Sequence, residues 1–197
     1  GPGSTNLVNG VANALLDRSP MIAVSGQLGT RLESTFTHQK VDQLAIFTPI
    51  SKWATKIGPD DAASVMRRAL RLSVAERPGP VHLTLNANYA KAEATDTAVA
   101  LPPMTASADW TQTALTDSTA DPVKRLQQAK RPIVLVGMSA MRGGAGPSLT
   151  AFAERLGCPV GTSPKGKGTL AEDHPYFAGT VDMACNKVIW EFLSTAD

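Results

Sequence analysis

Short apolar runs alternate with amphipathic helical patterns along this chain, and no other feature of the sequence restricts the fold as much. Residues 60–74 have apolar side chains at helical spacing, and Arg77-Pro78-Gly79-Pro80 ends the pattern. The apolar run Val81 to Leu85 follows at once and predicts a strand. The inward positions of the helix are expected at Ala62, Val65, Met66, Ala69, Leu70 and Val74. This order is typical of parallel α/β sheets.

Two such patterns occur, separated by a segment of different composition. Further strands are predicted at 21–24, 51–57, 133–136 and 158–160, with helices at 5–17, 121–129, 147–156 and 183–193. Residues 27–50 are polar and irregular, and residues 93–120 are rich in Ala, Thr, Ser, Pro and Asp, as in a linker. We expect two doubly wound α/β domains in series, residues 1–92 and 121–197. Both are predicted to be incomplete, because the patterns begin and stop abruptly.

Charge and composition exclude several classes of protein. The 19 basic and 17 acidic residues are too balanced for a nucleic-acid partner. No apolar run approaches the roughly 20 residues that span a bilayer, and no signal peptide is visible, so we expect a cytoplasmic protein. Cys158 and Cys185 form neither a disulfide framework nor a zinc signature, and His38, His82 and His174 lack metal-ligand spacing. No metal ligand is assigned.

Two glycine-rich segments are candidates for ligand binding. Gly1-Pro2-Gly3-Ser4-Thr5-Asn6 precedes a helical pattern, where glycines let a ligand approach the backbone and free N–H groups favour an anion. A plain helix-initiating loop and a remnant of cloning are alternatives. Gly137, Gly143 and Gly144 follow a strand and precede a helix, so they are expected either to cradle a nucleotide diphosphate or to form a tight turn. Lys165-Gly166-Lys167-Gly168 favours a phosphate or is simply solvated.

Taken together, five stretches in order resemble one family. Residues 1–10 (GPGSTNLVNG) are similar to the GPGxTNxxxG stretch of thiamine diphosphate enzymes of the acetolactate synthase type. Residues 19–27 resemble their strand ending in Gly-Gln, residues 38–42 their glutamine-containing segment, and residues 79–83 their GPVxL strand. Residues 173–175 (DHP) with Gly179 resemble a signature of their central domain. The resemblance covers nearly the whole chain.

This resemblance implies a domain assignment and partners. The family has pyrimidine-binding, central and diphosphate-binding domains, so residues 1–92 would be the second half of the first and residues 121–197 the start of the second. The activating glutamate and the ligands of magnesium and diphosphate would then lie outside this chain, which we expect to be inactive and prone to aggregation alone. The resemblance implies a homodimer or homotetramer, in which a second subunit supplies the diphosphate-binding domain.

The implied chemistry is carbanion catalysis on a 2-oxo acid, with thiamine diphosphate and Mg²⁺ as cofactors. The resemblance places Gln39 near the reacting centre, with His38 beside it, although a solvent-exposed histidine is an almost equal alternative. Gly1, Pro2, Gly3 and Asn6 would border the cofactor. Some relatives hold FAD or ADP in the central domain, which would be bound at Gly137, Gly143 and Gly144. His82 alternates with Val81 and Leu83, which predicts a structural role.

The chain departs from acetolactate synthases at two places. Their Pro-Lys-Asp after the GPVxL strand is replaced by Asn86-Ala87-Asn88, and their Phe-Gln-Glu by His38-Gln39-Lys40. These changes favour a decarboxylase, acyltransferase or carboligase. The alternatives are a non-catalytic module that binds FAD or ADP, and a regulatory domain that kept the fold and lost the chemistry.

Overall fold

A computed structural model describes residues 1–35, 37–95, 120–183 and 187–197. The chain forms two compact units, residues 1–104 and 105–197, and each is described separately. Most of the predicted linker, together with Cys185, lies outside the described residues.

The first unit is built on a parallel three-stranded sheet in the order β1-β3-β2. The strands are β1 (Met21–Gln27), β2 (Trp53–Ile57) and β3 (Pro80–Asn86). Parallel neighbours require crossovers, and helices supply them, as the alternating pattern predicts. Gln27 and Asn86 are register partners, so the carboxyl ends of β1 and β3 meet at one edge of the sheet.

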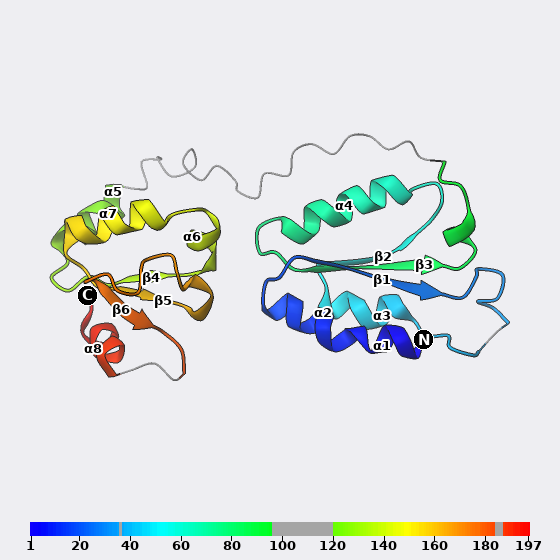
Figure 1. Cartoon of the computed structure of the whole chain (residues 1–197), viewed down its shortest axis with the longest axis horizontal. Helices are drawn as coiled ribbons and strands as arrows, with labels where there is room; N and C mark the ends of the chain where they lie inside the picture. Colours follow the sequence, from blue (N-terminus) through cyan, green and yellow to red (C-terminus); the bar gives the residue numbers. More distant parts are fainter. Residues whose placement is uncertain (36, 96–119, 184–186) are drawn as a thin grey trace. The chain divides into compact units, whose positions relative to one another are not determined.

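Helices cover both faces of this sheet (Figure 1). Helix α4 (Ala62–Val74) lies on one face, and α1 (Pro2–Thr5), α2 (Leu7–Leu16) and α3 (Gln43–Phe47) lie on the other. Short 3₁₀ turns, η1 (Thr48–Ile50) and η2 (Tyr89–Lys91), follow α3 and β3. The core under α4 is apolar and consists of Ile57, Val65, Ala69, Val81 and Leu83. Each such Val or Leu side chain contributes roughly 1.5–3 kcal/mol by leaving water.

The second unit has the same plan, with the parallel order β4-β5-β6. The strands are β4 (Val134–Val136), β5 (Val160–Thr162) and β6 (Phe177–Thr180). Figure 1 shows α5, α6 and α7 on one side of this sheet and α8 on the other. The helical segments are α5 (Ala120–Gln128), α6 (Met138–Arg142), α7 (Gly146–Leu156), the 3₁₀ turn η5 (Pro164–Gly166) and α8 (Lys187–Thr195). Val136, Ala153, Val160 and Leu170 form its core.

The predicted fold class, parallel α/β with helices on both faces of each sheet, is confirmed. Several local predictions were wrong. The segment 27–50 contains α3 and η1, and neither β6 nor α6 was predicted. The helix expected at 5–17 begins at Leu7, because Thr5 lies inside the separate short helix α1, where its hydroxyl donates to Pro2 O. Met66 is exposed, and Ser73 occupies the inward position instead.

No helix within the described parts of the chain is both long and apolar enough to cross a membrane.

Candidate functional site

The amino-terminal turn forms one wall of a cavity of about 430 Å³, which we call the Gly1 cavity. It is lined by Gly1, Pro2, Gly3, Ser4, Leu7, Val24, Ser25, Gly26 and Gln39. A Cβ added at Gly3 or Gly26 would meet no atom within 4 Å, so the backbone at both positions is open to a neighbouring group. Leu7 and Val24 add exposed apolar surface. A flat ring with polar edges fits such a wall, because glycine permits close approach to the backbone.

Gln39 reaches this cavity from the loop before α3. Its backbone is left-handed, with φ +58°, which a residue with a side chain adopts at a cost of about 1 kcal/mol or more. The loop packs tightly on Gly1: a Cβ built on Gly1 would lie only 2.4 Å from Gln39 O. Asp42 caps the following helix by accepting a hydrogen bond from Ala45 N (3.0 Å). The predicted residues Gly1, Pro2, Gly3 and Gln39 are therefore brought together.

A column of buried polar side chains lies beside the Gly1 cavity, on the face of β3 turned toward α1, α2 and α3. His82, Thr84 and Asn86 alternate along this strand with apolar residues, and each is at most 1% exposed. We call these three residues the β3 polar column. Strands of parallel sheets are usually apolar on both faces, because both are covered. Buried polar groups need partners, and Ser25 and Gln43 supply them here.

The hydrogen bonds of Gln43 fix the direction of this network. The amide group 2.8 Å from Gly26 O must be Nε2, because a carbonyl only accepts. Oε1 therefore accepts from Ser25 Oγ (2.7 Å) and Thr84 Oγ1 (3.1 Å). Since Ser25 has one hydroxyl proton and donates it to Gln43, His82 Nε2 must donate to Ser25 Oγ (2.8 Å). The network therefore places a proton on His82 Nε2.

Burial keeps His82 neutral. Loss of hydration lowers the pKa of His82 from 6.5 to about 4, because the charged imidazolium is disfavoured away from water. The ring stacks on Phe47, with centroids 3.7 Å apart and planes within 10°. Among the described residues, His82 Nδ1 has no hydrogen-bond partner, so a second proton would find no acceptor. His82 is a buried structural residue, as the alternation in its strand predicts.

A second cavity of about 340 Å³ lies next to the β3 polar column, on the side of Lys40 and Lys56. It is lined by Gln27, Glu33, Lys40, Val41, Asp42, Gln43, Leu44, Lys56 and Thr84. Glu33 Oε1 accepts from Asn86 Nδ2 (2.6 Å) and pairs with Lys56 Nζ (3.2 Å). The Asn86 hydrogen bond and the Lys56 contact lower the pKa of Glu33. The charges of this cavity are therefore largely compensated.

Other predicted residues lie elsewhere. His38 is exposed and is not among the residues that line either cavity, which agrees with the solvent-exposed alternative. Asn6 lies between α1 and α2 and is not part of the Gly1 cavity. Asn86 and Asn88, which replace the Pro-Lys-Asp pattern, hold the loop after β1: Asn86 donates to Leu28 O, and Asn88 Oδ1 accepts from Thr30 N (3.0 Å).

The glycine cluster of the second unit forms a closed turn. Gly137 precedes α6 in an extended conformation, Gly143 ends it, and Gly144 is left-handed with φ +68°. The amide groups of Gly143 and Gly144 donate to carbonyls inside the turn, Ser139 O (2.9 Å) and Met141 O (3.1 Å). These two amides are not available to a diphosphate, so the geometry agrees with the tight-turn alternative. Lys167 pairs with Glu172 (3.3 Å) and is half exposed.

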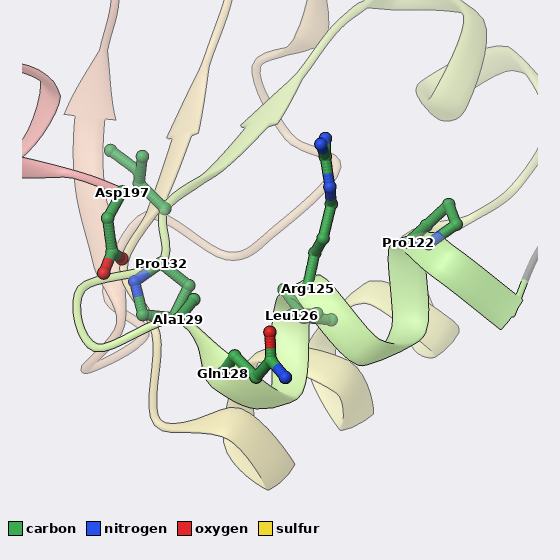
Figure 2. Close-up of a pocket in the computed structure, with 8 residues that line it drawn as sticks. Pro122, Arg125, Leu126, Gln128, Ala129, Pro132 and Asp197 are labelled. Carbon is green, nitrogen blue, oxygen red and sulfur yellow. The ribbon is translucent and has the colours of Figure 1, made fainter.

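Figure 2 shows a further cavity, of about 590 Å³, in the second unit. It lies between α5, the start of β4 and Asp197, and its lining includes Arg125 and Gln128. Asp197 accepts hydrogen bonds from Lys130 N (2.9 Å) and Arg131 N (2.8 Å), and these lower the pKa of its carboxyl group. No residue predicted to bind a ligand lines this cavity. Over the described ranges, no group of three or more His, Cys, Asp or Glu side chains is placed to hold a metal ion.

Ser25, Gln43 and Thr84 are candidates for supporting the site that sequence reasoning missed. Polar residues at every second position of 82–86 are the signal that could have found them, because a strand of a parallel sheet with both faces covered should not carry them without buried partners. Gln43 gives a weaker signal, as the first helical residue after an Asp cap.

Comparisons with known proteins identify similar sequences over both units. The family model "Thiamine pyrophosphate enzyme, N-terminal TPP binding domain" matches residues 1–46. The model "Thiamine pyrophosphate enzyme, central domain" matches residues 119–197. Together the two matches cover more than half of the chain.

Curated proteins similar to this chain include acetolactate synthases and a decarboxylase. A probable acetolactate synthase large subunit of Methanococcus aeolicus is 34% identical over 200 residues, covering 100% of this chain and 33% of that protein. An acetolactate synthase large subunit of Corynebacterium glutamicum is 33% identical over 93% of this chain and 29% of its own length. A probable 2-ketoarginine decarboxylase of Pseudomonas aeruginosa is 30% identical over 100% of this chain and 35% of its own length. The chain thus spans about a third of the relatives it matches.

Proposed function

Because the chain belongs to the thiamine pyrophosphate enzymes of the acetolactate synthase type, we propose that its first unit borders the pyrimidine ring of thiamine diphosphate at the Gly1 cavity. We assign residues 1–92 to the pyrimidine-binding domain, residues 93–120 to a linker and residues 121–197 to the central domain. The observation that carries this proposal is the meeting of the Gly1-Pro2-Gly3 turn with Gln39 around one cavity.

The residues of the Gly1 cavity fit an aminopyrimidine. Gly3 and Gly26 leave the backbone uncovered, so a planar ring can lie against it without meeting a side chain. Leu7 and Val24 offer apolar contact, which favours the ring over water. Gln39 brings an amide that can donate and accept, and this side chain has no hydrogen-bond partner among the described residues.

The whole enzyme is proposed to decarboxylate a 2-oxo acid and to release or transfer the remaining acyl group. Thiamine diphosphate, when bound with Mg²⁺, supplies a nucleophilic carbon and accepts the electron pair as carbon dioxide leaves. Gln39 is proposed to orient the reacting carbonyl or carboxylate by hydrogen bonding. The apolar wall excludes water from the site. A diphosphate-binding domain of a second subunit is the proposed partner, in a homodimer or homotetramer.

The residues after β3 favour a decarboxylase or carboligase over biosynthetic acetolactate synthesis. Asn86 and Asn88 are occupied in holding the loop 28–33, and Ala87 offers no cationic group where acetolactate synthases have a lysine. The relatives include proteins named for both kinds of activity. The alternative of a module that binds FAD or ADP is less favoured, because no comparison names such a ligand and the glycine turn uses its own amides.

Binding and turnover of the full-length protein test this proposal. We expect calorimetry to show saturable binding of thiamine diphosphate in the presence of Mg²⁺, and Gln39→Ala to lower kcat for carbon dioxide release more than it weakens cofactor binding. A panel of 2-oxo acids, assayed for carbon dioxide and for acetolactate, separates decarboxylation from carboligation. Absence of thiamine diphosphate binding would overturn the proposal, and FAD or ADP binding in its place would favour the alternative.

A further inference from the structure

Gln43 is a buried side chain whose full hydrogen-bonding capacity is used. It is 2% exposed, and its amide makes four hydrogen bonds, two as acceptor and two as donor. Oε1 accepts from Ser25 and Thr84, and Nε2 donates to Gly26 O (2.8 Å) and Ser4 Oγ (3.3 Å). These partners lie on α1, β1 and β3. One amide therefore joins three elements that are far apart in the sequence.

Two of these links lead directly to the Gly1 cavity. Ser4 Oγ, which accepts from Gln43, donates in turn to Gly1 O (2.7 Å) and so closes the turn that walls the cavity. Ser25 and Gly26 line the same cavity from the end of β1. Gln43 itself does not line it. Its amide therefore lies behind the wall of the Gly1 cavity and holds that wall from two sides.

A third link runs through the backbone to Gln39. Gln43 is the first residue of α3 and follows Gln39 by four positions, so anchoring Gln43 fixes the end of the loop that carries Gln39. Gln27 Nε2 donates to Val41 O (2.8 Å) and fixes the same segment a second time. Only Lys40 lies between Gln39 and the first of these anchored residues, so the backbone of Gln39 has few alternative conformations on this side. The left-handed φ of Gln39 lies directly before these two anchored residues.

We infer that Gln43 is a positioning residue, whose buried amide sets the distance between the Gly1–Ser4 turn and Gln39 and so shapes the Gly1 cavity for its ligand. The inference rests on the proposed function only for the identity of that ligand. A buried amide that merely filled space would be replaceable by an apolar side chain of similar length. A positioning amide is not replaceable in this way, because Ser4 and Gly26 would lose their donor.

Limited proteolysis of the full-length protein without cofactor tests the positioning role. Trypsin cleaves after Lys40, which lies three residues before Gln43 in the loop that Gln43 anchors. We expect Gln43→Met to raise the rate of cleavage after Lys40 about tenfold or more, because the population of the open loop rises with the loss of each hydrogen bond. Val65→Ala is the matched control: it destabilises the same unit from the opposite face of the sheet, where α4 packs. Equal increases in Gln43→Met and Val65→Ala would overturn the inference.

Calorimetric titration with thiamine diphosphate and Mg²⁺ provides a second readout. We expect Gln43→Met to weaken binding about tenfold or more and Val65→Ala to leave it unchanged at a temperature where both are folded. Ser4→Ala leaves Gln43 in place, removes its hydrogen bond to the amino-terminal turn together with the bond from Ser4 Oγ to Gly1 O, and covers the case in which Gln43→Met does not fold. We expect it to weaken binding with little change in Tm, and unchanged affinity would overturn the inference. If the wild type binds no thiamine diphosphate, the proposed function fails, while proteolysis still decides on Gln43.

Discussion

The buried histidine of β3 should make the first unit sensitive to mild acid. His82 is fully buried, and its pKa is lowered from 6.5 to about 4. The unfolded chain therefore binds more protons than the folded chain when the pH lies between these two values. The contribution of His82 to stability is fully present above pH 6.5 and is lost as the pH falls toward 4.

The size of the effect follows from the two pKa values. One pH unit between them corresponds to about 1.4 kcal/mol, so the complete loss is roughly 3 kcal/mol. At pH 5 only part of this loss has occurred, so the free energy of unfolding should fall by about 2 kcal/mol between pH 7 and pH 5. The structure supplies the physical reason: a protonated ring would carry an N–H at Nδ1, where no described group accepts it, and its charge would lie between Phe47 and the sheet.

A non-titrating variant isolates this contribution. His82→Gln keeps an N–H donor for Ser25 and stays neutral at every pH. Urea unfolding of wild type and variant, followed by circular dichroism at pH 7, 6 and 5, yields the difference between their free energies of unfolding at each pH. We expect the wild type to lose about 2 kcal/mol relative to His82→Gln from pH 7 to pH 5. Parallel curves for the two proteins would refute the reasoning, because the carboxylates common to both would then explain all acid sensitivity.

Three further substitutions probe backbone contacts, each by urea unfolding. Gly166→Ala should destabilise the second unit by roughly 1–3 kcal/mol, because its Cβ would lie 2.5 Å from Val136 O, and an unchanged midpoint would contradict this. Gly10→Ala, with no atom within 4 Å of its Cβ, should instead stabilise α2 by about 1 kcal/mol, and a loss of stability would show an unrecognised contact. Lys52→Met should lower the free energy of unfolding by about 1 kcal/mol, because Lys52 Nζ donates to Ala75 O (3.1 Å) at the end of α4. Lys91→Met, on an exposed turn, is the control and should change the free energy of unfolding little.

The sequence was sufficient to predict the parallel α/β class because its signals are local. The helix 62–74 and the strand 80–86 are separated by a Pro-Gly-Pro stop, and each has its own periodicity. The segment 43–50 was missed because α3 has only five residues, too few for a helical period to stand out. Strand β6 was missed because Phe177–Thr180 has two small residues and no apolar run.

The candidate site was predictable only in part. Gly1, Pro2, Gly3 and Gln39 were identified by resemblance, and the fold brings them to one cavity. Ser4, Ser25 and Gln43 lie 18 or more residues apart, and only the pairing of β1 with β3 and the packing of α3 brings them together. Apart from the alternating polar residues of 82–86, long-range hydrogen bonding of this kind leaves no periodic trace in a single sequence.

The left-handed backbone of Gln39 has a consequence for attempts to make this protein more robust. Glycine or asparagine would adopt φ +58° at lower cost, and the described residues offer the Gln39 side chain no compensating bond. A laboratory selection for thermal resistance alone should therefore discard glutamine at this position early. On the role proposed for Gln39, a selection that also demands catalysis should keep it. Heat tolerance and turnover would then compete at position 39, and a pair of parallel selections would measure how strongly.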